Sequence, residues 1–197
     1  DMDAAIAHCA RGASIWQWAS NDDDGVPDVV LACAGDTPTL ETVAAAWWLR
    51  KNIPEMKVRV VNVVDLMALF PPYAHPHGMD HTAFETLFTA EQPVVFAFHG
   101  YQHAIHEIVH GRSNASRFHV RAFEEQGTTT TPFDMVVRNH MSRYNIAAEA
   151  LRRSARVFNR APALAQECEN LIAKAVAYSR EHFEDLPEIT DWTWSEG

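Results

Sequence analysis

An apolar run at residues 58–64 sets the first limit on the fold. Only Arg59 and Asn62 interrupt it, and its valine-rich composition is typical of a strand covered on both faces of a sheet. Apolar runs at residues 29–34 and 94–98 predict two further strands. Helix signals lie between the runs, so the pattern predicts parallel pairing through right-handed crossovers and a three-layer α/β/α sandwich.

Capping residues mark where the helices between these strands begin. Thr37 is a good N-cap for a helix that runs to about residue 51. Asp80 or Thr82 caps the next helix, and Thr82 with Glu85 forms a capping box. The rest of the chain predicts a short helix ending at Gly111, an edge strand at residues 118–123 and a long helix containing Leu164 and Tyr178.

The N-terminal segment makes the predicted sheet mixed. The first ten residues favour a short helix that Gly12 ends, and residues 14–19 read as a strand. A polar, turn-rich loop at residues 20–25 separates this strand from the run at 29–34, so we expect the two to form an antiparallel hairpin. The expected fold class is α/β with a mixed five-stranded sheet whose first strand is antiparallel.

Composition narrows the classes of function. The 197 residues carry 16 Lys and Arg against 26 Asp and Glu, and the resulting net charge of −10 argues against binding to nucleic acid or an anionic membrane. No apolar run approaches the roughly 18 residues that a membrane span requires. Three widely separated cysteines favour a reducing, cytoplasmic location. We expect one domain over residues 1–197, with an α/β core at 1–160 and a helical extension with a tryptophan-containing tail at 161–197. Because the chain begins at Asp1, we also expect a fragment or a processed product.

One short motif suggests a metal. His106, Glu107 and His110 match the His-Glu-x-x-His pattern, in which two imidazoles bind zinc and the glutamate activates water. Zinc needs a third ligand, and the sequence offers no metzincin continuation, while Gly111 ends the helix directly after the second histidine. We therefore assign no metal site, and a zinc hydrolase stays the weaker alternative.

Four polar rings gather where the strand at 94–98 gives way to a helix: His99, Tyr101, His103 and His106. Open α/β sheets bind ligands in the crevice at the carboxyl ends of their strands. The rings are therefore interpreted either as the lining of a phosphate or sugar site or as structural histidines at a domain seam. The second interpretation is favoured because no general base with a paired nucleophile can be named.

Three further features are candidates for interaction. The loop with Thr128 and Thr129 leads into a helix start, where helix capping is favoured over anion binding. Six arginines, with Arg152 and Arg156 among them, share a helical stretch with one acid; a solvated face is the default interpretation, and an acidic partner or a phosphorylated regulator is the alternative. The tryptophans at 192 and 194 are costly to leave in water, so we expect the tail to pack on another domain or subunit.

Longer motifs follow one another in order over nearly the whole chain. They are IWQWASND at 15–22, PDVV at 27–30, GDTPTLET at 35–42, RVVNVVDLM at 59–67, HPHG at 75–78, FAFHGY at 96–101, GTTTTPFDM at 127–135 and EITDWTW at 188–194. Together they resemble the C-terminal domain of phosphoketolases, a family of transketolase-like thiamine-diphosphate enzymes.

The resemblance implies a fold and a parent reaction. The fold is that of a transketolase C-terminal domain, with an antiparallel first strand. The reaction is a lyase reaction that cleaves xylulose 5-phosphate or fructose 6-phosphate with inorganic phosphate, giving acetyl phosphate and a shorter aldose phosphate. In the family, thiamine diphosphate and Mg²⁺ lie between two preceding domains of a homodimer. The resemblance therefore assigns no catalytic, cofactor-binding or metal-binding residue to this sequence, and the fragment alone is expected to be inactive.

Two roles stay open for the domain itself. The first is architectural: the domain packs on the preceding domains and stabilises the dimer. The second is regulatory: a small effector binds in the crevice or at the arginines. The candidate effector or interface residues are His99, Tyr101, His103, His106, Thr128, Thr129, Arg152 and Arg156.

Overall fold

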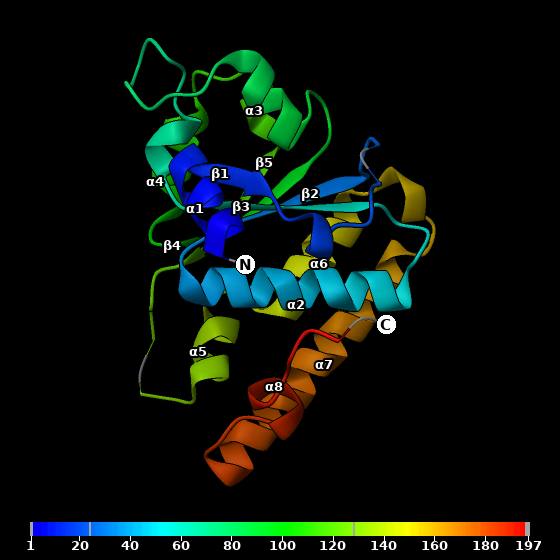
Figure 1. The fold of residues 1–197 in the computed structure, drawn as a ribbon. Coiled ribbons are helices and arrows are strands. Elements are labelled where there is room, and N and C mark those ends of the chain that lie inside the picture. The colour runs from blue at the N-terminus through cyan, green and yellow to red at the C-terminus, as the bar shows by residue number, and fades with distance from the viewer. Residues whose placement is uncertain (1, 24, 128, 196–197) are drawn as a thin grey trace.

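The computed structural model, which describes residues 2–23, 25–127 and 129–195, contains one five-stranded sheet with helices on both faces (Figure 1). The strands are β1 Ala13–Ile15, β2 Val29–Ala34, β3 Val58–Val63, β4 Val94–His99 and β5 Phe118–Phe123, in the order β1-β3-β2-β4-β5. All pairs are parallel except β1 with β3, so the predicted mixed sheet with an antiparallel first strand is confirmed. The predicted edge strand is β5.

The predicted hairpin between the first two strands is wrong. β1 pairs with β3, where Ser14 lies opposite Asn62, and β1 ends at Ile15, after which Gln17–Ala19 form a 3-10 turn. The reason lies in the polar loop, whose side chains satisfy the backbone of β3. The Ser20 hydroxyl accepts from the Val60 amide at 2.9 Å, and the Asn21 side chain accepts from the Val58 amide at 2.6 Å. The loop therefore follows β3 before the chain enters β2.

The helices lie where the capping signals place them, with local corrections. They are α1 Met2–Arg11, α2 Asp36–Asn52, α3 His81–Phe88, α4 Gln102–Val109, α5 Pro132–Arg138, α6 Arg143–Arg153, α7 Ala161–His182 and α8 Pro187–Thr190. Asp80 caps α3 by accepting from the Ala83 amide at 2.7 Å. The capping box predicted from Thr82 is wrong because Thr82 already lies inside that helix, and the N-cap of α2 is Gly35 rather than Thr37.

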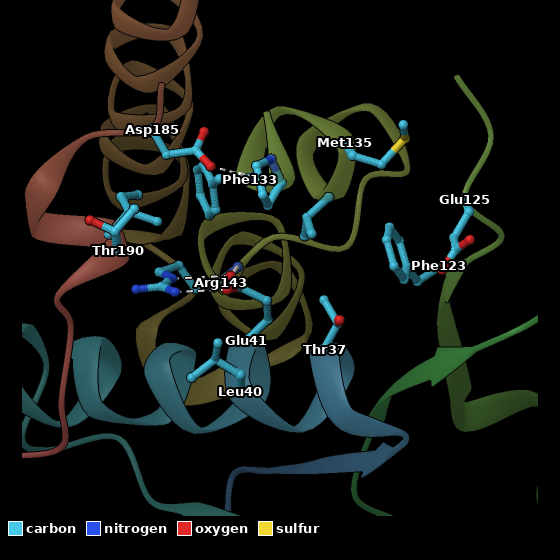
Figure 2. A pocket seen from close by; sticks show the side chains of 13 residues that line it. Thr37, Leu40, Glu41, Phe123, Glu125, Phe133, Met135, Arg143, Asp185 and Thr190 are labelled. Atoms are coloured by element: carbon cyan, nitrogen blue, oxygen red, sulfur yellow. Dashed lines mark hydrogen bonds and ion pairs between the residues drawn. The ribbon is translucent and has the colours of Figure 1, made fainter. Parts of the chain in front are cut away.

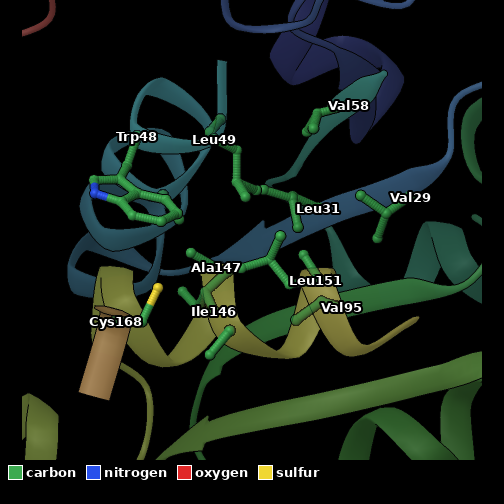
Figure 3. Close-up of a cluster of buried hydrophobic side chains, with 14 of the residues drawn as sticks. Val29, Leu31, Trp48, Leu49, Val58, Val95, Ile146, Ala147, Leu151 and Cys168 are labelled. Atoms are coloured by element: carbon green, nitrogen blue, oxygen red, sulfur yellow. The ribbon is translucent and has the colours of Figure 1, made fainter. Parts of the chain in front are cut away.

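Two apolar layers hold the sheet between the helices. On one face, α2 and α6 pack on the central strands through Leu49, Ile146 and Leu151, and α7 adds Cys168 (Figure 3). Burial raises the pKa of the Cys168 thiol to about 12. On the other face, α3 and α4 cover the sheet with a second cluster that includes Phe84, Phe88, Phe96, Ile105 and Phe118. Both faces of the central strands are therefore covered, as the apolar run at 58–64 predicts.

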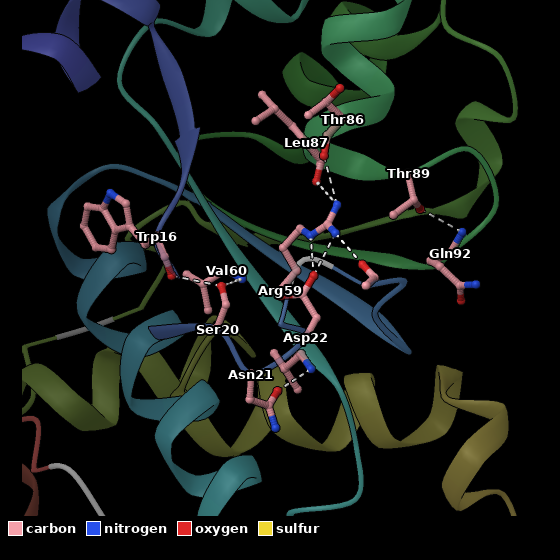
Figure 4. A network of polar contacts seen from close by, with 12 residues as sticks. Trp16, Ser20, Asn21, Asp22, Arg59, Val60, Thr86, Leu87, Thr89 and Gln92 are labelled. Atoms are coloured by element: carbon pink, nitrogen blue, oxygen red, sulfur yellow. Dashed lines mark hydrogen bonds and ion pairs between the residues drawn. The ribbon is translucent and has the colours of Figure 1, made fainter. Parts of the chain in front are cut away.

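The arginine inside that apolar run is satisfied by a buried network (Figure 4). Arg59 donates from Nε to Asp22 Oδ2 at 2.8 Å, from Nη1 to the Thr86 carbonyl at 2.9 Å and from Nη2 to the Gly25 carbonyl at 2.8 Å. Both members of the ion pair are buried, at 7% exposure for Arg59 and 5% for Asp22. The network fastens β3 to the loop before β2 and to the end of α3.

The tryptophan tail packs on its own chain. Trp194 meets Trp18 edge-on with ring centroids 5.0 Å apart, and Trp192 meets Trp47 at 6.2 Å. The Trp47 indole N–H also donates to the Ser195 carbonyl at 2.9 Å. Both rings are half-buried against α2 and the 3-10 turn before β2, so part of the tail's apolar surface is covered within this chain. That the tail also packs on another domain or subunit stays a prediction. Across the described ranges, no helix is long and apolar enough to cross a membrane.

Candidate functional site

A pocket of about 540 Å³ opens between the first turns of α2 and the helices α5, α6 and α8 (Figure 2). This volume falls in the range of small-molecule sites. The walls are mostly apolar, and β5 contributes Phe123 at its carboxyl end. The lining residues are Thr37, Leu40, Glu41, Phe123, Glu125, Pro132, Phe133, Met135, Val136, Arg143, Asp185, Ile189 and Thr190.

A buried ion pair lies at the base of this pocket. Arg143 donates to Glu41 three times: from its backbone amide to Oε2 at 2.6 Å, from Nε to Oε2 at 3.0 Å and from Nη2 to Oε1 at 2.7 Å. Both side chains are at most 5% exposed. The guanidinium also lies over the rings of Phe133 and Trp192, at 5.5 and 5.3 Å from their centroids. The pair therefore joins α2 to α6 and fixes the pocket floor.

The loop before α5 shapes the opposite wall. Thr131 caps this helix by accepting from the Asp134 amide, Pro132 occupies its first turn, and the Phe133 amide donates to Asp185 Oδ2 at 2.8 Å. Burial opposes ionisation of Asp134, but hydrogen bonds from Thr130 and Arg138 outweigh it and lower the pKa of Asp134. The wall is thus held by contacts between α5 and the segment before α8.

The predicted crevice lies beside this pocket, at the carboxyl end of β4. The His99 ring lies between two carboxylates, with Nδ1 at 3.3 Å from Asp36 Oδ1 and Nε2 at 3.0 Å from Glu125 Oε1. Hydrogen bonds from the Thr37 amide and from His99 lower the pKa of Asp36. Gly35 packs against the same histidine at φ +103°, and a Cβ there would lie 2.7 Å from the His99 Cβ. The immediate surroundings of His99 are therefore acidic.

The structure does not bring the candidate residues to one place. Tyr101 is the exposed N-cap of α4, and its ring lies 5.7 Å from that of His103, while His106 is exposed further along the helix. Thr129 lines a separate hollow with Arg138 and Phe183, and Thr128 lies outside the described residues. Arg152 and Arg156 lie beyond α5, at the end of α6 and in the turn after it.

The zinc motif is split by the end of its helix. His106 lies in α4, whereas His110 is the C-cap residue, and both rings are exposed. Over residues 2–23, 25–127 and 129–195, no three His, Cys, Asp or Glu side chains form a group that could hold a metal ion. The described side chains therefore supply no third ligand for these two histidines.

The six arginines of the basic stretch are already paired. They belong to α5, α6 and the turns that follow rather than to one helix, and each contacts a carboxylate. The pairs are Arg138–Asp134, Arg143–Glu41, Arg152–Glu169, Arg153–Glu149, Arg156–Asp28 and Arg160–Glu55. The prediction of a single helix face is corrected accordingly, but five of the six side chains are solvated, at 43 to 57% exposure, and only Arg143 is buried. Arg138 and Arg153 pair within their own helices, whereas the other four connect separate segments of the chain.

Glu149 is a paired, buried carboxylate whose charge links stability to pH. Burial raises its pKa, but Arg121 and Arg153 outweigh that effect, so the pKa of Glu149 lies below its ordinary value of 4.5. Its contribution to stability is fully present above that ordinary value and is lost as pH falls through the folded-state pKa. We therefore expect Glu149→Gln to flatten the decrease in unfolding free energy between about pH 5 and pH 3.

Urea unfolding at both pH values measures this slope. Glu169→Gln is the matched control, because Glu169 also pairs with an arginine but is 53% exposed. The control should keep the slope of the parent protein. An unchanged slope in Glu149→Gln would contradict the assignment.

The pocket has the chemistry of a binding surface. Its lining includes no serine, cysteine or histidine, and its one arginine is already bonded to Glu41. Sequence reasoning missed Glu41, Phe133, Arg143 and Asp185 as a group because they come together only in three dimensions. The one available signal was Glu41, an acid within a helix segment that is otherwise apolar or small.

The fold is that of an α/β domain of the transketolase C-terminal type. This follows from the mixed sheet, its strand order and the helices on both faces. The family described as "XFP C-terminal domain" matches residues 1–194, and the chain belongs to this family of phosphoketolase C-terminal domains. It is 49% identical over 194 residues to "Probable phosphoketolase 2" of Nostoc sp. and 52% identical over 194 residues to a "Probable phosphoketolase" of Rhodopseudomonas palustris. A "Probable phosphoketolase" of Mycobacterium avium is 53% identical over 196 residues. Each match covers 98% of this chain but only 24 or 25% of the relative, so the chain spans about a quarter of the length of these relatives.

Proposed function

We propose that this chain is the C-terminal, non-catalytic domain of a phosphoketolase. The full-length enzyme cleaves xylulose 5-phosphate, fructose 6-phosphate or both with inorganic phosphate, giving acetyl phosphate and an aldose phosphate. The observation that carries the proposal is the match over 98% of the chain to relatives named phosphoketolase that are about four times as long. The enzyme is a cytoplasmic homodimer in this proposal.

Thiamine diphosphate and Mg²⁺ belong to the other domains in this proposal. The fit of the described residues to a magnesium diphosphate is poor. The candidate pocket holds one arginine, which Glu41 neutralises, and its remaining charged residues, Glu125 and Asp185, are acidic. A diphosphate is held by free cationic side chains or backbone amides, and its metal is held by free carboxylates directed at it. In this proposal the residues of this chain take no direct part in the reaction.

The domain has an architectural role in this proposal. It packs on the preceding domains and stabilises the dimer. Support comes from large apolar side chains that this chain leaves exposed on several elements: Met2, Ile6, Trp18, Val26, Leu40, Val64, Tyr73, Tyr101, Phe158 and Phe183. Apolar side chains that are neighbours on the surface are typical of interaction sites, and Met2 and Ile6 are such neighbours on one helix face.

Acetyl phosphate production tests the proposal. We expect the full-length protein to release acetyl phosphate from xylulose 5-phosphate or fructose 6-phosphate with phosphate, thiamine diphosphate and Mg²⁺ present. The isolated chain should release none above a boiled control. Activity of the isolated chain would overturn its non-catalytic role, and an inactive full-length protein would overturn the reaction.

The regulatory alternative has one observation in its favour, the 540 Å³ pocket. The charges around it do not suit a phosphorylated effector, because Asp36 and Glu125 flank His99 and the pocket arginine is neutralised. Melting temperature in the presence of inorganic phosphate or ATP separates the two roles. The architectural role predicts no shift, and a rise that follows ligand concentration would support an effector site instead.

A further inference from the structure

The helix α1 presents an apolar stripe to solvent. Met2, Ala5, Ile6 and Cys9 follow the i, i+3, i+4, i+7 spacing of one helix face, and all four are exposed, Met2 at 74% and Ile6 at 60%. No residue of α1 is buried. We call these four residues the α1 face. Such a stripe normally faces a core, so its exposure in this domain points to a partner.

The other side of α1 is already occupied. His8 accepts or donates at both ring nitrogens, with Nδ1 at 2.6 Å from the Ser14 hydroxyl and Nε2 at 2.8 Å from Asn62 Oδ1. These contacts hold α1 beside β1, at the edge of the sheet (Figure 1). At the end of the helix, the Gly12 carbonyl accepts from the Val64 amide at 2.8 Å, and Val64 is 51% exposed. The domain thus orients α1 with its apolar face outward.

The length of α1 adds a second reason to expect a partner. Helices shorter than about 12 residues are marginal in water unless they bury an apolar face. α1 has 10 residues and buries none of them within this domain. Its stability in the whole protein therefore requires a surface that covers Met2 and Ile6.

We propose that the α1 face is the docking surface for the domain that precedes this one in the full-length protein, an inference that rests on the proposed function. The occupant follows from the comparisons. The matched family is a C-terminal domain, and the relatives are about four times as long as the match, so most of their length precedes it. A domain in the same chain has a high effective concentration at this surface. An apolar patch on that domain would cover the α1 face.

The alkylation rate of Cys9 can report whether this contact forms. Cys9 lies on the α1 face and is exposed, whereas Cys33 and Cys168 are buried. Burial raises the pKa of both buried thiols, that of Cys168 to about 12, so they react slowly with alkylating reagents and serve as internal references. The rate of Cys9 alkylation therefore reports directly whether the α1 face is covered.

The experiment uses native full-length protein, iodoacetamide and peptide mass spectrometry. We expect Cys9 to be alkylated slowly in the parent protein and roughly tenfold faster in the Met2→Gln/Ile6→Gln variant. Glutamine keeps a high helix propensity, so α1 itself is preserved while its apolar face is lost. Phe183→Gln is the matched control, because Phe183 is 86% exposed at the end of α7, and it should leave the Cys9 rate unchanged.

Two outcomes would overturn the docking proposal. Fast alkylation of Cys9 in the parent protein would show that the α1 face is uncovered. If Cys9 is alkylated slowly in the concentrated protein but rapidly once the protein is diluted to monomers, the α1 face is covered by a second copy of the chain instead. Alkylation needs no catalysis, so these results are independent of acetyl phosphate release, whose absence in the parent protein would count against the proposed function alone.

Discussion

Replacing Arg143 with methionine is expected to lower the free energy of unfolding by about 3–5 kcal/mol. The substitution removes the two hydrogen bonds that the Arg143 side chain donates to Glu41, whereas the bond from the Arg143 backbone amide is kept. It leaves the Glu41 carboxylate buried without a counter-charge. It also removes the cation that lies over Phe133 and Trp192. Urea unfolding of the variant measures the loss.

The control for this prediction is Arg152→Met. Arg152 also pairs with a glutamate, but it is 47% exposed and Glu169 is 53% exposed, so the loss should stay within about 1 kcal/mol. Adding Glu41→Gln to Arg143→Met should recover part of the stability, because the amide is uncharged. Equal losses in Arg143→Met and Arg152→Met would contradict a buried pair at the pocket floor.

Replacing Arg59 with methionine is expected to cost a similar amount, about 3–5 kcal/mol, on the far side of the sheet. Asp22 Oδ1 has no hydrogen-bond partner among the described residues, and Oδ2 is bonded to Arg59. The variant would therefore leave a carboxylate buried and unpaired, and the carbonyls of Gly25 and Thr86 would each lose a donor. Thermal and urea unfolding should both show the loss.

A double-mutant cycle isolates the charge effect at Arg59. Asp22→Asn removes the stranded charge, so Arg59→Met should cost less in that background than in the parent protein. Lys57→Met is the matched control, because its pair with Asp23 is exposed, and its effect should stay within about 1 kcal/mol. An Arg59→Met variant as stable as the Lys57→Met control would contradict the network in Figure 4.

The layers of the fold follow from local signals. The apolar runs predict β2, β3 and β4 because a strand covered on both faces is apolar at most positions rather than at alternate ones. The two N-cap candidates Asp80 and Thr82 place the start of α3 to within two residues, because a capping hydrogen bond involves only residues close in sequence. These elements depend on neighbouring residues alone, so the sequence contains enough information to place them.

The pairing of β1 and the pocket depend on distant residues instead. A three-residue strand carries no signal that separates β3 from β2 as its partner, and the deciding hydrogen bonds come from the loop side chains of Ser20 and Asn21. Glu41 suits a helix N-terminus by its charge, yet the structure uses it as the buried acceptor for Arg143. The polar residues Arg59 and Asn62 inside the apolar run carry a signal that the sequence-based predictions did not use, because buried polar groups require partners.

The sequence separation of 102 residues from Glu41 to Arg143 also sets the order in which contacts form during synthesis on the ribosome. All five strands emerge before α6, so the nascent sheet forms with α2 still lacking its ion-pair partner and the apolar packing of Ile146 and Leu151. The Trp47 indole N–H lacks its hydrogen-bond acceptor for longer, because Ser195 is synthesised 148 residues after it. The apolar side of α2 therefore stays uncovered until α6 has been synthesised, and it is a surface to which we expect a chaperone to bind during translation.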